Sequence, residues 1–170
     1  MEFFDKKYEI FKMFNEDWGL ATADNIHDFD GCTISWGSLG DVWGEIDNGR
    51  YIATIYIHPD RYTHKYLQSN DYFSVSFFDK KYKADLGILG NKSKRDGDKF
   101  ALTSLTPVEK GNTVIFEEAN LTFICKKIYY EQFNAKNIAP DVLVNIYTGG
   151  KEPHFQYIGE IVEVIDKRED

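Results

Sequence analysis

The sequence predicts a β-rich α+β fold in which the strands close into a barrel and short helices lie outside it. Six segments have the β-branched and aromatic content and the flanking breakers typical of strands, whereas three short segments have helical spacing. The 170 residues are enough for one sizeable core, and no repeat, low-complexity stretch or Pro/Gly/Ser-rich linker divides them. We therefore predict a single domain over residues 1–170. A closed barrel is expected because closure removes exposed strand edges.

The sequence marks some of the predicted strands more strongly than others. Tyr51–Ile57 is almost continuously apolar and stops at a His-Pro pair. Tyr72–Phe78 alternates Phe and Val with Tyr and Ser, which is the pattern of a half-buried strand. The predicted strands are Leu20–Ala23, Cys32–Trp36, Tyr51–Ile57, Tyr72–Phe78, Asn120–Tyr130 and Tyr157–Ile165.

Three segments are predicted to be helical. Asp60 is a candidate N-cap for a helix over Arg61–Gln68. Lys80–Leu89 has apolar residues at helical spacing, and Gly90 behind them is a candidate C-cap. A third helix is expected over Asp96–Ser104, with its apolar side chains toward the core.

Composition excludes several classes of protein. Acidic residues outnumber basic residues by 28 to 20, and the net charge of −8 argues against general nucleic-acid binding, which requires a basic face. No apolar run approaches the ~20 residues that a membrane-spanning helix needs. Met1–Phe14 mixes Phe with charged residues, unlike a secretory signal or a transit peptide. Cys32 and Cys125 have no metal-ligand spacing, so we expect reduced thiols in a cytoplasmic protein with no nucleic-acid or membrane partner.

No pattern in the sequence marks a metal site or a hydrolytic site. His27 and His64 have no metal-ligand spacing, and HExxH, CxxC and Ser/His/Asp arrangements are not found. Aromatic residues make up 16% of the chain. Most of them are expected in the core, and a few suit the walls of a pocket for a planar ligand.

Five motifs follow one another in a characteristic order between about residues 15 and 165. They are TISWG at 33–37, IHPDRYT at 57–63, GNKSKRDGDK at 90–99, FEEA at 116–119 and YIGEI at 157–161. Together they resemble the flavin reductase-like, FMN-binding split β-barrel family, which includes flavoredoxin-type proteins.

The resemblance implies a split barrel of antiparallel strands, FMN as the ligand, and a homodimer with flavin sites near the subunit interface. It also implies reduction of flavin by NADH or NADPH in the flavin pocket itself, since no GxGxxG motif follows a strand to mark a separate dinucleotide domain. The flavin carries this chemistry, so no catalytic side chain is expected. Two alternatives stay open. One is a flavoredoxin-like electron carrier reduced by a redox protein partner, and the other is a flavin-binding protein without turnover.

This sequence departs from the family pattern at several positions. His58 stands where family members usually carry Arg, and Lys94 stands in place of Gly. Asp30 and Cys32 replace an Asn and a Met. A neutral imidazole binds phosphate less strongly than a guanidinium, whereas Lys94 restores a charge nearby. By the resemblance, Asp30 places a negative charge near the flavin edge.

The resemblance and the side-chain chemistry assign the phosphate of FMN to one loop. Ser93 offers a hydroxyl donor, Arg95 a planar fork, and Lys94 and Lys99 compact charges. The predicted helix beginning at Asp96 would add free backbone N–H groups. The alternative is a solvated basic surface loop.

A second group of candidates follows His58 at the end of a predicted strand. Arg61, Tyr62 and Thr63 are expected in the first turn of a helix, where they would bind phosphate or ribityl oxygens. The alternative is that Arg61 forms a surface ion pair and Tyr62 packs against the barrel.

The flavin ring is assigned to the predicted strand at Cys32–Trp36. Thr33, Ser35 and Trp36 are the candidate residues for the ring. Thr33 and Ser35 point to the same side of a strand and can line a cleft. Trp36 points to the opposite side, and its alternative role is core or dimer packing. His154, just before the last strand, is a candidate group near the flavin or the nicotinamide. The alternative for His154 is a structural histidine.

Overall fold

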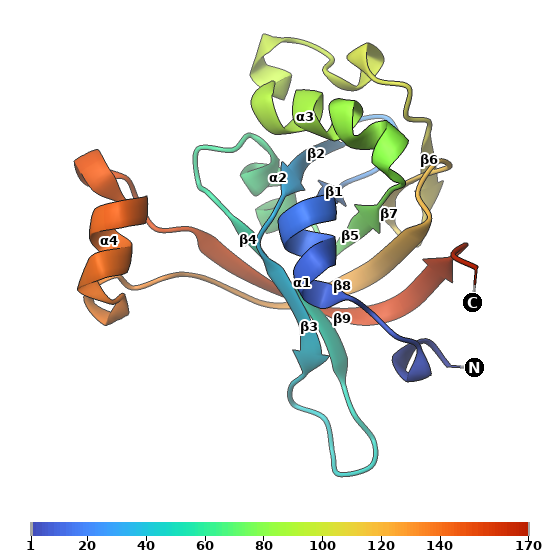
Figure 1. Ribbon diagram of the computed structural model, residues 1–170, viewed down its shortest axis with the longest axis horizontal. Coiled ribbons are helices and arrows are strands. Elements are labelled where there is room, and N and C mark those ends of the chain that lie inside the picture. Colours follow the sequence, from blue (N-terminus) through green and yellow to red (C-terminus); the bar gives the residue numbers. More distant parts are fainter. Residues whose placement is uncertain (1, 170) are drawn as a thin grey trace.

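Seven strands form one strongly curved sheet in the computed structural model, which describes residues 2–169 (Figure 1). The strand order is β2-β1-β5-β8-β9-β4-β3, and every neighbouring pair is antiparallel. A separate antiparallel hairpin consists of β6 and β7. The strands are β1 (Gly19–Ala23), β2 (Asp30–Ile34), β3 (Gly37–Asp41), β4 (Tyr51–Ile57), β5 (Tyr72–Phe77), β6 (Pro107–Lys110), β7 (Thr113–Phe116), β8 (Leu121–Gln132) and β9 (Phe155–Asp166).

This architecture confirms the predicted β-rich α+β fold and the split barrel. The expected closure of the barrel is wrong. The sheet curls around a core, but its edge strands β2 and β3 are not paired with each other within residues 2–169, so the barrel stays open along one side. The core contains the alternating apolar residues of β5 that the sequence predicts to face inward, Phe73, Val75 and Phe77.

The α-helices are short and lie outside the sheet. The helix α1 (Ile10–Lys12) continues into a π-helical turn, and α3 covers the sheet beside β2 (Figure 1). The helix α4 stands apart from the barrel, at the tip of an arm formed by the far ends of β8 and β9 (Figure 1). The other helices are α2 (Thr63–Ser69), α3 (Lys83–Asn91) and α4 (Pro140–Ile146).

The arm exists because β8 and β9 are each 12 residues long, well beyond the length of the other strands. Their pairing is interrupted by register shifts, one of them at Lys127–Tyr129, where the arm leaves the barrel. Gly159 is needed at this crossing, since a Cβ there would lie 2.5 Å from atoms of both Cys125 and Phe73. The glycine thus lets β9 approach the side chains of β8 and β5 closely.

All six predicted strands are present, with Tyr51–Ile57 matching β4 in both bounds. The strands β3, β6 and β7 are absent from the prediction, although β7 consists of the strand-forming residues Thr, Val, Ile and Phe. The strand β3 carries two Gly, a Ser and an Asp, which have low strand propensity, and it is held at the sheet edge by its pairing with β4. The strands β6 and β7 have four residues each, too few to show a period.

The predicted helix over Asp96–Ser104 is wrong. The structure has only 3₁₀ turns at Lys94–Asp96 and Phe100–Leu102, and Gly97 between them has a φ of 130°, which no helix residue adopts. No helix N-terminus therefore faces a ligand from this loop. Leu102 is 60% exposed rather than turned toward the core.

The predicted helix caps differ as well. The helix α2 begins at Thr63, two residues later than predicted, with Tyr62 rather than Asp60 in the cap position. The helix α3 runs through Gly90 and ends at Asn91, so that Gly90 is not its C-cap. Both shifts move the ends of these helices relative to the candidate binding residues.

Among residues 2–169, no helix is long and apolar enough to cross a membrane.

Candidate functional site

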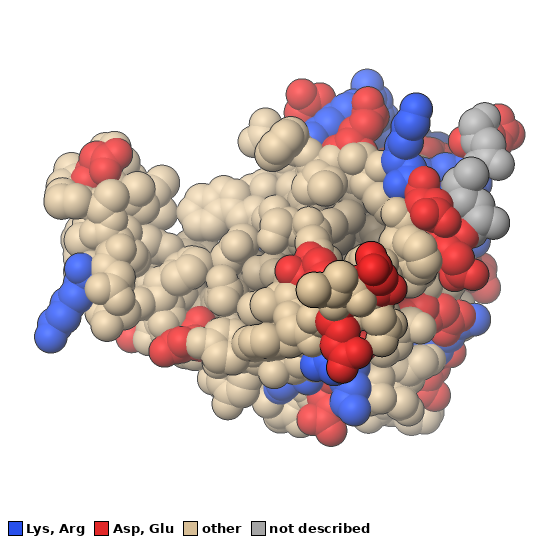
Figure 2. All heavy atoms as spheres, turned by 90° about the horizontal axis from the view of Figure 1, so that it is seen from below, with Lys and Arg blue, Asp and Glu red and all other residues tan. Residues whose placement is uncertain are grey.

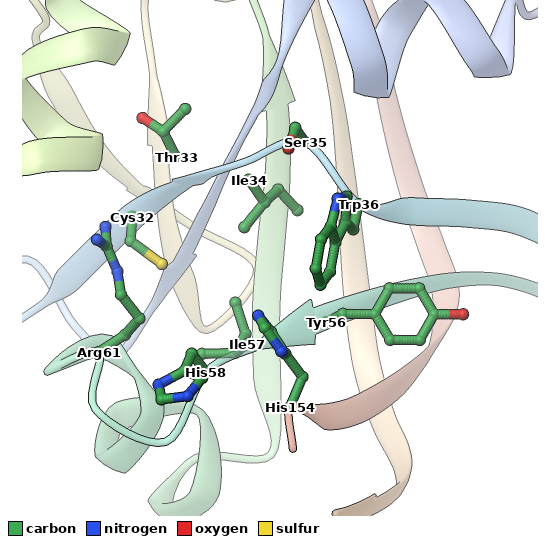
Figure 3. Close-up of a pocket in the computed structure, with 10 residues that line it drawn as sticks. All are labelled: Cys32, Thr33, Ile34, Ser35, Trp36, Tyr56, Ile57, His58, Arg61 and His154. Atoms are coloured by element: carbon green, nitrogen blue, oxygen red, sulfur yellow. The ribbon is translucent and has the colours of Figure 1, made fainter. Parts of the chain in front are cut away.

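A pocket of about 250 Å³ lies where β2 and β4 end, beside the base of the arm (Figure 3). It brings together segments far apart in the sequence, including five of the predicted flavin-binding residues and His154. Its lining consists of Cys32, Thr33, Ile34, Ser35, Trp36, Tyr56, Ile57, His58, Arg61 and His154.

Trp36 belongs to this pocket and not to the core. Alternation along a strand places Trp36 opposite Thr33, but β2 ends at Ile34, so the alternation does not extend to Trp36. Trp36 is 44% exposed, and its ring lies 4.7 Å from that of His154. Figure 3 shows the indole hanging over His154.

The two hydroxyl residues of this segment have different surroundings. Thr33 lines the pocket, but its hydroxyl donates a hydrogen bond to the carbonyl oxygen of Leu86 in α3. This bond fixes the end of β2 against α3. Ser35 is exposed on the pocket lining. The hydroxyl of Ser35 is therefore the one presented to a ligand.

Two imidazoles form the floor of the pocket. The rings of His58 and His154 lie 5.1 Å apart and are nearly perpendicular. The backbone N–H of His154 donates to the Tyr147 hydroxyl, and the same hydroxyl shares a second hydrogen bond of 2.8 Å with Nδ1 of His154. Burial, and then the neighbouring His58, lower the pKa of His154 to about 4. His154 is thus neutral at pH 7.

Nε2 of His58 is a buried polar atom without a hydrogen-bond partner. The Nδ1 atom of this ring accepts the backbone N–H of Asp60 at 3.2 Å, so the proton of the neutral ring is on Nε2. A buried donor without an acceptor is costly and calls for an explanation. An acceptor supplied by a ligand in the pocket would satisfy it.

Arg61 joins the pocket to the end of α3. Its guanidinium donates to the carbonyl oxygens of Gly90 at 2.6 Å and Leu89 at 3.3 Å. A cation at a helix C-terminus is favourable because the last carbonyl groups carry partial negative charge. Two of its five N–H donors thus hold α3 in place, and Arg61 also lines the pocket, where it stays a candidate for phosphate or ribityl oxygens.

The lysines of the 92–99 loop also bind protein acceptors. Lys94 donates to the carboxylate of Asp28 at 2.6 Å and to the carbonyl oxygen of Phe29 at 2.7 Å. Lys99 is only 4% exposed. It lies against the fully buried Asp30, so Asp30 is not an exposed charge at a ligand edge. These contacts argue against a simply solvated basic loop.

Arg95 is an exposed cation of this loop, as is Lys92, and it lies beside the pocket rim. One guanidinium nitrogen donates to the carbonyl oxygen of Asp60 at 3.0 Å, and the guanidinium lies 5.1 Å from the ring of Tyr62. Ser93 accepts the backbone N–H of Arg95 and so shapes the turn, while its hydroxyl proton is available as a donor. Tyr62 packs partly against the core, and Thr63 is buried.

Sequence patterns did not single out Tyr147, which follows α4 and contacts His154. Nothing in its local pattern distinguishes it from other tyrosines of the chain. Tyr56 and Ile57 also line the pocket. Their position there follows from the predicted strand Tyr51–Ile57, because they end it directly before His58.

The model of the flavin reductase-like domain family matches residues 51–170 of the chain. The chain belongs to this family. The match begins at β4, so that β1, β2 and β3 with Thr33–Trp36 lie outside it. None of the curated proteins compared with the chain matches it.

Solved structures share the fold along nearly the whole chain. The FMN-binding protein of Thermus thermophilus with bound p-hydroxybenzaldehyde is 17% identical, with a TM-score of 0.68 over 98% of this chain and 82% of that one. Flavoredoxin from Methanosarcina acetivorans is 17% identical, with a TM-score of 0.65 over 88% and 68%. A Streptomyces globisporus NADH:FAD oxidoreductase with NAD and FAD fragments is 14% identical, with a TM-score of 0.62 over 88% and 74%.

Proposed function

We propose that the chain binds FMN, with the flavin ring in the pocket under Trp36 and the phosphate at Ser93 and Arg95, and reduces it with NADH or NADPH. The observation that carries the proposal is the unpartnered, buried Nε2–H of His58 in a pocket built from the family's motif segments. The fold is shared with an FMN-binding protein and with an NADH:FAD oxidoreductase, which supports the same assignment.

The residues of the pocket fit a flavin. Its carbonyl oxygens and ring nitrogens are acceptors, and the pocket presents the Nε2–H of His58, the His154 imidazole and the Ser35 hydroxyl. Trp36 offers an aromatic face. The volume of about 250 Å³ is smaller than that of a typical pocket that encloses its ligand, so one side of a bound ring would stay accessible to a second molecule.

A bound flavin would accept a hydride from a nicotinamide, and the protein would supply position and electrostatics. His154, whose pKa is lowered to about 4, would face the ring edge without placing a full charge beside it, and His58 would offer a second imidazole there. Arg95 supplies a guanidinium for phosphate oxygens. Arg61 and the Thr33 hydroxyl fix α3, which keeps the pocket wall and the phosphate loop in register.

We further propose that residues 1–170 act as one domain and that two copies form a homodimer. The arm supports the homodimer, because Val142, Val144 and Ile146 of α4 are apolar side chains that are 40%, 66% and 41% exposed. Figure 2 shows few charged side chains between the arm and the barrel. A second copy of the chain would cover these apolar side chains. Sedimentation equilibrium should give about twice the chain mass of 19.7 kDa.

The visible spectrum of the purified protein tests flavin binding, and chromatography of the released cofactor distinguishes FMN from FAD. Anaerobic mixing with NADH or NADPH should then bleach the bound flavin within minutes. Bleaching by dithionite but by neither nucleotide would favour the flavoredoxin-like electron carrier. A colourless protein that also fails to bind added FMN would contradict the proposal.

A further inference from the structure

Three buried polar side chains from three different segments meet behind the pocket. Asp30 begins β2, Thr63 begins α2, and Lys99 ends the 92–99 loop. They are 0%, 1% and 4% exposed, respectively. We call these three residues the Asp30 cluster. Each belongs to a segment that carries candidate flavin-binding residues.

The contacts of the cluster converge on the Asp30 carboxylate. The Thr63 hydroxyl donates to Oδ2 at 2.8 Å, and the Lys99 ammonium lies 3.6 Å from Oδ1, which has no hydrogen-bond partner of its own. The same ammonium donates to the carbonyl oxygens of Leu89 and Lys92 at 3.3 and 3.4 Å. Lys99 thus links the end of α3 and the start of the loop to β2.

This geometry leaves Lys99 unsuited to bind phosphate directly. Only 3% of its side chain is exposed, and its three protons have two carbonyl oxygens and one carboxylate as neighbours. Burial lowers the pKa of Lys99, and the Asp30 carboxylate opposes that effect. A buried charge is tolerated only when its partner stays in place, so the two residues depend on each other.

We propose that Asp30 and Lys99 are positioning residues, which hold the Ser93–Arg95 turn against β2 and α2 at the distance that the flavin phosphate requires. The inference rests on the proposed flavin function. It gives Asp30, an acidic residue, a favourable effect on the binding of an anion. It also gives Lys99 an indirect role through the loop in place of a contact with phosphate.

The sign of the Asp30 effect makes the inference testable. By charge alone, Asp30→Asn removes a negative charge near a bound phosphate and should tighten FMN. If Asp30 positions the loop, the same change frees Lys99 and weakens FMN. Riboflavin has the same ring and no phosphate, so its affinity should change little in either case.

The experiment measures the dissociation constants of FMN and riboflavin by fluorescence titration for Asp30→Asn, Lys99→Met and the double variant. We expect about tenfold weaker FMN binding in each single variant, corresponding to one lost charge-assisted contact, and less than about twofold change for riboflavin. The double variant should lose less than the product of the two single losses, because it leaves no unpaired buried charge.

Matched controls come from the same loop. Lys92→Met and Asp96→Asn remove one exposed charge of each sign outside the cluster, and each should change FMN binding less than about twofold. Thr63→Val removes the hydroxyl that binds Asp30 but no charge. It should weaken FMN about threefold and leave riboflavin unchanged, and it carries the test if a charge variant does not fold.

Unchanged or tighter FMN binding in Asp30→Asn would overturn the inference. Equal losses of FMN and riboflavin would also overturn it, since they would show a general structural role. Weaker FMN binding in Lys99→Met with normal binding in Asp30→Asn would make Lys99 a direct ligand. Wild-type protein that binds neither flavin would instead overturn the proposed function, and the inference with it.

Discussion

The pocket and the 92–99 loop differ in how much of their polar chemistry is free to bind a ligand. In the pocket, the buried Nε2 of His58 has no partner and Ser35 is exposed. In the loop, Lys94 and Lys99 are engaged with Asp28 and Asp30. The basic-looking loop is thus largely neutralised by the protein, whereas the pocket keeps donors of uncharged side chains such as Ser35 available. A cation in a motif is evidence for an anion site only when its donors are not already used.

The largest expected loss of FMN affinity is at Arg95, an exposed cation of the loop beside the pocket. Arg95→Ala removes a charge-assisted contact worth about 1.5–3 kcal/mol, so FMN should bind roughly 10- to 200-fold more weakly. Riboflavin should lose little affinity in the same fluorescence titration. Full FMN affinity in this variant would place the phosphate elsewhere, and equal losses for both flavins would show that Arg95 supports the fold.

The next effect concerns the pH dependence of the pocket floor. His154 has a pKa of about 4 in the folded protein, well below the ordinary histidine value of 6.5. As the pH falls, His154 is therefore protonated in the unfolded chain before it is protonated in the folded protein. Its contribution to the free energy of unfolding is fully present above pH 6.5 and is lost as the pH falls from 6.5 toward 4. Allowing for partial solvent exposure, the loss is about 2 kcal/mol.

His154→Phe tests this, since it keeps an aromatic ring between Trp36 and Tyr147 but cannot titrate. The slope of unfolding free energy between pH 4 and 6.5, from urea titrations, should decrease. It should not vanish, because burial also lowers the pKa of His64. His27→Asn at an exposed site is the matched control. An unchanged slope in His154→Phe would show that His154 is not held neutral by the fold.

A smaller effect separates the two hydroxyls at the end of β2. Ser35→Ala should weaken FMN and riboflavin equally, by about 2- to 12-fold, because one neutral hydrogen bond to the ring is worth roughly 0.5–1.5 kcal/mol. Thr33→Val should change flavin affinity less, since its hydroxyl binds the Leu86 carbonyl, and should lower the melting temperature instead. A reversed order of affinities would assign the ring contact to Thr33.

The smallest effect is expected at Lys94. Its ammonium is bound to Asp28 and Phe29, so Lys94→Met should change FMN affinity less than about threefold, through screened long-range charge alone. Isothermal titration calorimetry with FMN on Lys94→Met and Arg95→Ala compares the contributions of these two adjacent cations to FMN affinity. A loss at Lys94 as large as that at Arg95 would show that the Asp28 contact breaks when FMN binds.

Much of the site was predictable from local sequence. The apolar run at Tyr51–Ile57 places a strand, and the motif that follows it brings His58 and Arg61 to the strand end. The surroundings of Trp36 were not predictable in this way, since a two-residue period holds only while the strand continues. Tyr147 carries no signal at all, because its role depends on the return of the chain from α4 to His154.

The sequence by itself determined the β-rich fold, the family, and the segments that meet at the pocket, because strand patterning and ordered motifs are local properties of the chain. Only the tertiary structure decided which charged side chains remain free. Whether Lys94, Arg95 or Lys99 can reach a ligand depends on Asp28, Asp60 and Asp30, which lie at least 35 residues away along the chain. A hydrogen-bond donor is used by whichever acceptor the fold places beside it, and spacing along the sequence does not encode that choice.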